Sequence, residues 1–275
     1  MPKLRFLQNL VSSEKLQLPK EPLDESSKEI SGYKLDYKKG TVYIVEMATS
    51  EHGAAVEIIG DAFRELCPRA TYGSRNNAPI QLLGQPLHDA PDGTRRAPDL
   101  AVYPHHNYIP DPPVPHPGPP PSDRRGNPYA RVMLEVAVTQ SFSDLKDKCR
   151  LWKRQSYVRS VLGIKLYDVL ATRDAAERRE RHMKATLWRQ GVAKQKWHFG
   201  TVNKDGSPIG ANGCNAANNP NYLINIPVAD IFYDPAIQAI GYIGPLALPL
   251  TALYHANVTI DLYEVQQAVL MKQEK

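Results

Sequence analysis

The chain has 275 residues, of which 42% are hydrophobic and 23% charged, so it is large enough to bury a hydrophobic core. Its formal net charge of +5 favours a polyanionic partner only weakly. Its three cysteines, Cys67, Cys149 and Cys214, are far apart and lack zinc-ligand spacing, so a disulfide-stapled secreted fold is not expected. The N-terminus lacks the apolar core of a signal peptide and no stretch approaches about 20 apolar residues, so we expect an intracellular protein of the cytoplasm or nucleus.

The first elements expected along the chain are a hairpin and a helix. Residues 1–30 are polar and broken by proline, which predicts a flexible N-terminal segment. Next, "YKLDYKKGTVYIVEMA" has two β-rich runs around the turn signal Lys38-Lys39-Gly40, which predicts a hairpin. Apolar residues then recur at helical spacing over 51–66, and Thr49 or Ser50 can cap that helix.

Two strands, "PIQLLG" and "APDLAVY", are expected before a segment that breaks every periodic pattern. Ten of the 25 residues over 104–128 are proline, a composition that favours polyproline II and builds no core. One interpretation is a solvated insertion between two strands. The other is a ligand for SH3- or WW-type domains.

The middle of the chain predicts a strand in "RVMLEVAVT", a helix over 143–156 and a second strand over 161–170. Residues 171–275 are expected to form a β-rich C-terminal extension packed on the core that spans residues 31–170. In this extension, "RDAAERRERHMK" indicates a solvated turn or short helix. Asp261, three residues before Glu264, predicts the cap of a C-terminal helix. Strand runs broken by helices favour an α/β or α+β fold with helices packed on a sheet.

Two of the predicted strands each contain one carboxylate, Asp99 and Glu135. Strands adjacent in sequence often pair, so these carboxylates can converge at one end of the sheet. Converging carboxylates repel unless one is protonated or a cation lies between them, and Mg²⁺ favours such oxygen ligands. The alternative for each acid is a position on the solvent face of its strand.

A lysine on the following helix supports the first alternative. Leu145, Cys149 and Trp152 mark the inward stripe of that helix, and Lys148 falls on the same stripe. A lysine beside two carboxylates suits a group that orients a water molecule or stabilises charge on a phosphate. The other interpretation is that Lys148 extends along the sheet to solvent.

The order of these residues resembles the PD-(D/E)XK nuclease superfamily, the restriction-endonuclease-like fold, and more narrowly its Uma-type branch of endonucleases. The resemblance covers about residues 33–170. It is carried by short motifs in a fixed order: Asp36 and Gly40, Met47-Ala48-Thr49, His52, Pro98-Asp99, Glu135-Val136, Ser141 to Ser143, and Asp144-Leu145 with Lys148.

This resemblance implies a mixed central sheet flanked by helices, with Asp99 and Glu135 as ligands of Mg²⁺ or Mn²⁺. The superfamily has a lysine at the position of Ala137, so the resemblance implies that the lysine role has moved to Lys148. Gln140 is a second candidate for orienting the attacking water. His52 contacts the metal-bound water or phosphate, or else is a core-facing or capping histidine.

Two functions follow as hypotheses. The first is metal-dependent hydrolysis of phosphodiester bonds in nucleic acid, with DNA as the expected substrate and basic stretches holding its backbone. The second is a catalytically inactive protein of the same fold that binds nucleic acid, or a protein partner through the proline-rich segment. Ala137 is the feature that favours the second hypothesis.

Overall fold

The computed structural model describes residues 33–38, 41–47, 49–66, 77–89, 95–106, 108, 130–155, 157–233 and 256–273. The predicted flexible segment 1–30 lies outside these residues, as does the predicted proline-rich insertion apart from residues 104–106 and 108. The chain divides into two compact units, residues 1–48 and 49–275. The first unit contains the predicted antiparallel hairpin, formed by β1 (Tyr33–Lys38) and β2 (Thr41–Met47).

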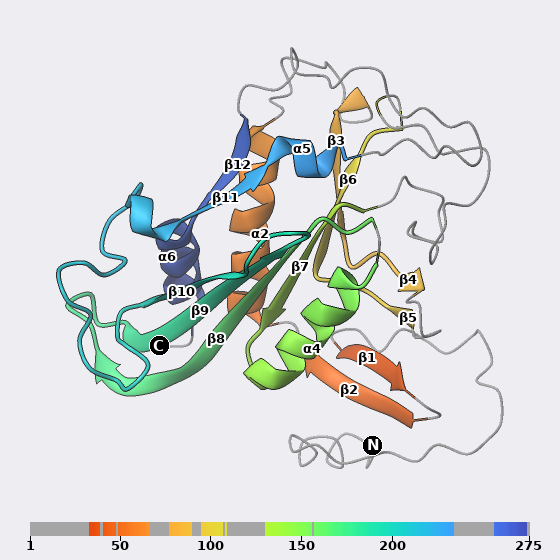
Figure 1. Ribbon diagram of the computed structural model, residues 1–275. Coiled ribbons are helices and arrows are strands. Elements are labelled where there is room, and N and C mark those ends of the chain that lie inside the picture. The colour runs from red at the N-terminus through yellow and green to blue at the C-terminus, as the bar shows by residue number, and fades with distance from the viewer. Residues whose placement is uncertain are drawn as a thin grey trace. The chain divides into compact units, whose positions relative to one another are not determined.

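A six-stranded mixed sheet forms the centre of the second unit, in the order β10-β9-β8-β7-β6-β3 (Figure 1). Its strands are β3 (Ile80–Gly84), β6 (Leu100–Pro104), β7 (Val132–Ala137), β8 (Ser160–Arg173), β9 (Arg179–Arg189) and β10 (Gln195–Gly200). Strands β7 and β8 pair in parallel and every other neighbouring pair in this sheet is antiparallel. The parallel pair requires a crossover, which the helix α4 (Phe142–Lys153) provides.

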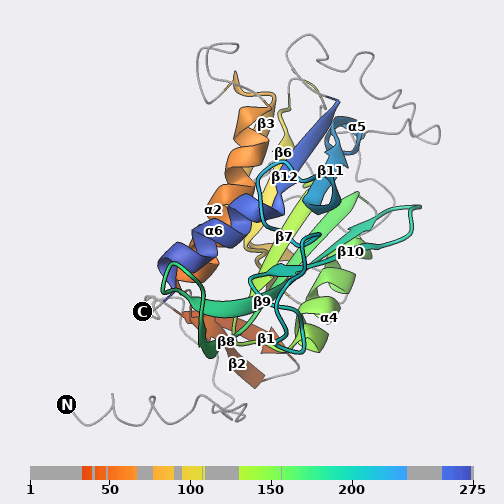
Figure 2. The same cartoon turned by 90° about the vertical axis from the view of Figure 1, so that its left-hand side faces the viewer.

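Helices cover both faces of this sheet (Figure 2). One face packs against α2 (Ser50–Glu65), α6 (Leu262–Lys272) and the antiparallel pair of β11 (Leu223–Pro227) and β12 (Asn257–Asp261). The opposite face packs against α4. Successive side chains of β7 point to opposite faces of the sheet. Val132, Leu134 and Val136 pack on the face covered by α2 and α6, and Met133 and Ala137 pack on the face covered by α4. The predicted mixed sheet flanked by helices is confirmed.

The helix boundaries follow from local capping. The side chains of Thr49, Ser141 and Asp261 accept hydrogen bonds from the N–H groups of the first turns of α2, α4 and α6. Such caps satisfy amide groups that have no partner inside the helix. Four shorter elements complete the described structure: β4 (His88–Asp89), β5 (Arg95–Arg96), the 3₁₀ turn η2 (Pro220–Tyr222) and α5 (Val228–Ile231). Within the described ranges, no helix combines the length and apolar character needed to cross a bilayer.

The structure differs from expectation after residue 170. That predicted boundary falls inside β8, and the following residues add β9 and β10 to the same sheet. The charged run expected as a solvated turn or short helix forms an exposed turn at residues 175–177, but its second half enters β9 at Arg179. Strand β9 buries Met183, Ala185 and Leu187 on one face. Burial of these alternating apolar side chains stabilises a strand here despite the high charge of the run.

Gly163 sets how closely α4 can approach the sheet. A Cβ atom at this position of β8 would lie 2.9 Å from Cys149 Sγ and 3.0 Å from a ring carbon of Trp188. We therefore expect Gly163→Ala to lower the free energy of unfolding by roughly 1–3 kcal/mol, the usual cost of overpacking. Urea unfolding measures this change. The control is Gly53→Ala in α2, where no atom lies within 4 Å of the added Cβ; equal stability of the two variants would contradict the close packing of α4.

Candidate active site

Asp99 immediately precedes β6, and Glu135 lies within β7 at the position opposite Asp99 when the β6–β7 register is continued by one residue. The Asp99 N–H donates to the Leu134 carbonyl at 3.0 Å, and the Val136 N–H donates to Asp99 Oδ2 at 2.7 Å. These two hydrogen bonds bracket Glu135. The exposed fractions of Asp99 and Glu135 are only 4% and 1%, so neither acid lies on a solvent-facing side of its strand.

The first turn of α2 contributes His52 to the same place. Thr49 Oγ1 accepts a hydrogen bond from the His52 N–H at 3.2 Å, which fixes the start of the helix. The Nε2 atom of His52 lies 3.2 Å from Asp99 Oδ2, and both side chains are almost fully buried. A histidine at the positive end of a helix is well suited to hold a carboxylate. His52 is thus both part of the capped turn and a direct neighbour of Asp99.

Glu135 is held from the other face of the sheet by α4. The Nε1–H of Trp152 donates to Glu135 Oε1 at 2.6 Å, and both residues are buried. The His88 ring meets the Trp152 ring edge-on, with centroids 5.8 Å apart. Tyr103 Oη lies 2.9 Å from His88 Nε2. Sequence reasoning identified Trp152 only as a core residue and found no signal for His88, which lies in a stretch without periodicity.

Lys148 lies one helical turn before Trp152, on the same side of α4. Its side chain is half-buried. Burial raises the pKa of the Cys149 thiol well above its usual value; the charges of Glu135 and Asp99 raise it further and that of Lys148 lowers it. All three charged groups therefore lie within electrostatic range of one thiol.

Ala137 is fully buried in the apolar cluster beneath α4. Its partner on the next strand is Lys165 of β8, a residue that the sequence analysis did not single out. The ammonium group of Lys165 donates to the Val138 carbonyl, just past the end of β7. A lysine in an otherwise apolar strand was the available signal for this residue. Gln140 is half-buried between β7 and Ser141, the cap of α4, and its predicted role remains a prediction.

The donor set fits a hard divalent cation. Mg²⁺ is commonly bound through one or two carboxylates, with water and substrate phosphate completing its coordination, and Asp99 and Glu135 provide two adjacent carboxylates. Within the described part of the chain, no group of three or more His, Cys, Asp and Glu residues is arranged to hold a metal. A cation held by these two acids would take its remaining ligands from water and substrate.

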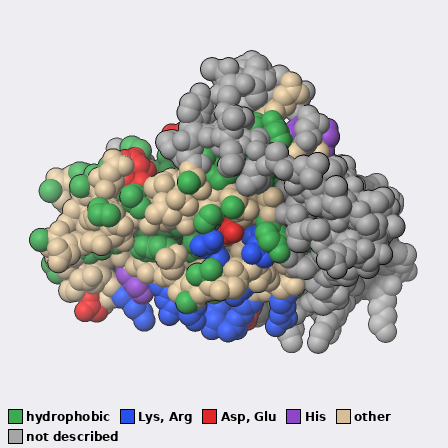
Figure 3. All heavy atoms as spheres, turned by 45° about the horizontal axis from the view of Figure 1, so that its top comes forward, with side chains coloured by type: hydrophobic (Ala, Val, Ile, Leu, Met, Phe, Trp, Pro, Cys, Tyr) green, Lys and Arg blue, Asp and Glu red, His purple; other side chains and the backbone are tan. Residues whose placement is uncertain are grey.

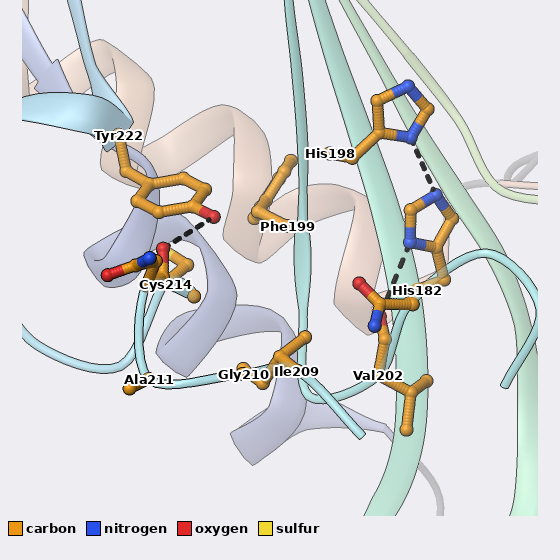
Figure 4. Close-up of a pocket in the computed structure, with 12 residues that line it drawn as sticks. His182, His198, Phe199, Val202, Ile209, Gly210, Ala211, Cys214 and Tyr222 are labelled. Carbon is orange, nitrogen blue, oxygen red and sulfur yellow. Dashed lines mark hydrogen bonds between the residues drawn. The ribbon is translucent and has the colours of Figure 1, made fainter. Parts of the chain in front are cut away.

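A separate pocket of about 260 Å³ lies at the far end of the sheet (Figure 4). Its wall includes His182 of β9 and His198 of β10, together with Asn212, Cys214 and Tyr222 from later segments. It shares no residue with the acid pair.

Comparison with known proteins gives one family. The family model described as "Uma2: Putative restriction endonuclease" matches residues 17–179. No curated protein matches the chain significantly. Among solved structures, the crystal structure of a putative nuclease belonging to DUF820 from Anabaena variabilis ATCC 29413 is 10% identical in sequence. That match covers 59% of this chain and 75% of that chain, with a TM-score of 0.37.

The hydrogen bond from Trp152 to the buried Glu135 should contribute to the stability of the protein beyond the packing of the indole ring. Trp152→Phe keeps an aromatic ring but removes the N–H donor, and loss of a partner of a buried charged group costs about 1–3 kcal/mol or more. We expect a larger loss of unfolding free energy than for Trp188→Phe, a matched change in the same apolar cluster. Chemical denaturation of both variants checks this. Equal losses would mean that ring volume, and not the bond to Glu135, accounts for the effect.

Proposed function

The chain belongs to the Uma2 family of putative restriction endonucleases, and we propose that it is a divalent-metal-dependent endonuclease acting on DNA. The observation that carries this proposal is the burial of two carboxylates, Asp99 and Glu135, at neighbouring positions of paired strands, where Asp99 bonds to the backbone on both sides of Glu135. An acid pair that serves only the fold gains little, because burial and mutual repulsion both oppose its charge. A bound cation would offset both costs, and binding that cation would give the acid pair a function.

Asp99 and Glu135 are the residues that would hold Mg²⁺ or Mn²⁺. When bound, such an ion supplies positive charge that polarises the phosphate and lowers the pKa of a coordinated water. The surrounding residues fix the carboxylates in place before substrate arrives. His52 and the Val136 N–H position Asp99, and Trp152 positions Glu135. The proposed role of His52 is therefore to orient a ligand, with contact to water or phosphate as its second possible role.

Lys148 is the proposed substitute for the lysine that Ala137 replaces. It projects from the turn of α4 that precedes Trp152, and its charge acts on the same thiol as those of Asp99 and Glu135. From there its ammonium group would stabilise the charge that develops on the phosphate or orient the attacking water. Gln140 is the second proposed group for holding that water. Lys165 has a defined structural task, since it donates to the Val138 carbonyl.

A second candidate function is favoured by Ala137 itself. Its complete burial under α4 leaves the superfamily's lysine position apolar. In this alternative the fold binds nucleic acid without cleaving it, or binds an SH3- or WW-type partner through the proline-rich insertion. Either function would act inside the cell. Metal titration distinguishes them, because the nuclease should bind Mg²⁺ or Mn²⁺ at the acid pair and a pure adaptor should not.

Asp99→Asn should abolish metal binding and cleavage while the protein still folds. The amide keeps the size of the side chain and its carbonyl can still accept from the Val136 N–H, but the negative charge is lost. Relief of like-charge repulsion should leave stability unchanged or slightly raised. Calorimetric Mn²⁺ titration, plasmid cleavage and thermal unfolding test the three parts. An Asp99→Asn variant with wild-type cleavage would remove the proposed chemistry.

Lys148→Ala should slow cleavage by roughly 100-fold or more, the scale of losing a positioned electrostatic group. DNA affinity should change little, since one charge among many is removed. The matched control is Arg154→Ala, an exposed cation at the other end of α4. Single-turnover cleavage and binding are measured for both variants. Equal cleavage rates for the two would assign Lys148 no special role and would favour the non-catalytic candidate.

A further inference from the structure

A row of side chains crosses the sheet on the face covered by α4. In this row, Ala137 of β7 pairs with Lys165 of β8, Lys165 with Lys184 of β9, and Lys184 with His198 of β10. Directly paired residues point to the same face, and Glu135, two residues before Ala137, shares that face. With strands about 4.8 Å apart, the row extends roughly 14 Å from the acid pair's strand to the edge of the sheet.

More cations gather around the outer part of this row. Basic side chains form a band along one edge of the described surface in the space-filling view (Figure 3). We use the name cationic strip for seven residues: Lys184, the two histidines beside it, and the four lysines whose charges act on Lys184 (Lys146, His182, Lys184, Lys194, Lys196, His198 and Lys204). Most of these side chains are exposed, while Lys146 and Lys184 are half-buried and His182 is buried. Six of the seven lie on or beside β9 and β10, and Lys146 lies on α4, two residues before Lys148.

The charges of the strip are not compensated by any acid in the part of the chain that the structure describes. None of the seven residues forms an ion pair with a described acid. Lys184 lies over the Phe142 ring at 3.7 Å, which holds its stem at the start of α4. Partial burial and repulsion from the four neighbouring lysines lower the pKa of Lys184. A surface that concentrates like charges in this way gains energy when an anion binds.

The two histidines extend this surface along β9 and β10. His198 Nδ1 lies 3.2 Å from His182 Nε2, and the rings stack with centroids 5.2 Å apart. Both lie on the side of β10 away from Tyr222 and Cys214 (Figure 4). Desolvation and nearby lysines lower the pKa of each histidine. In the neutral pair His182 Nδ1–H donates to the Val202 carbonyl at 3.4 Å and His182 Nε2 accepts from His198 Nδ1–H, so the lysines are the groups that would bind an anion. The same lysines would repel a metal ion, so an anion is the expected ligand.

We propose that the cationic strip binds the phosphate backbone of the nucleic acid on the side of the scissile phosphate that faces β9 and β10. The inference rests on the proposed function, because the row that contains Lys184 and His198 starts at β7, the strand that carries Glu135, and ends at the edge strand β10.

The test compares two variants of equal net charge in the full-length protein. Lys184→Gln with Lys196→Gln removes two cations of the strip. Lys272→Gln with Arg154→Gln removes two exposed cations from the ends of α6 and α4. Binding to a fluorescent 30-base-pair duplex is measured by anisotropy in EDTA, over a range of salt concentrations. No cleavage is needed, so the result is independent of whether the protein proves to be a nuclease.

We expect the strip variant to bind at least 10-fold more weakly, with a salt slope less negative by about 0.9 for each lost phosphate contact. The control should bind like the wild type. If both variants bound the duplex equally weakly, the strip would contribute no more than general surface charge, and the proposal would be overturned. The nucleic-acid assignment would be overturned if the wild type failed to bind the duplex. It would also be overturned if poly-glutamate of equal charge displaced the labelled duplex as well as unlabelled duplex does. Absence of cleavage by the wild type, with the strip variant weakened as expected, would support the strip while removing the proposed nuclease.

Discussion

The burial of two carboxylates at neighbouring strand ends is the constraint around which the structure is arranged. Charge in a low-dielectric interior is costly, and two like charges side by side raise the cost. The fold offsets it with directed partners: His52 and the Val136 N–H for Asp99, and the indole of Trp152 for Glu135. These partners come from α2, β7 and α4, so helices on both faces of the sheet support one pair of acids. A divalent cation would complete the compensation.

Helix α4 links the packing of the core to the chemistry of the site. Gly163 provides the space into which Cys149 and Trp188 fit, and so determines how near the helix lies to the sheet. That distance in turn decides whether Trp152 reaches Glu135. Because Lys148 is on the same side of the helix one turn earlier, its position depends on the same contact. Lys148 of α4 can replace a lysine at position 137 of β7 only when α4 packs this close to the sheet.

Local pattern was sufficient to predict the buried strands and the inward face of α4. The apolar runs around Asp99 and Glu135 indicated buried strands, and the stripe of Leu145, Cys149 and Trp152 oriented α4. Cross-strand register is different, because it depends on which strands become neighbours after folding. For this reason the sequence did not indicate that Lys165 lies opposite Ala137. The second half of the charged run, which enters β9, was misassigned for the same reason. The alternation of Met183, Ala185 and Leu187 indicates a strand only once β8 and β10 are known to be its neighbours.

The central claim is that Asp99 and Glu135 share a divalent cation. Crystals soaked in Mn²⁺ and measured near the manganese absorption edge test it directly. We predict an anomalous-difference peak within about 2.5 Å of a carboxylate oxygen of each residue, as expected for oxygen ligands of such ions. A map with manganese only at surface carboxylates, and none between Asp99 and Glu135, would contradict the claim.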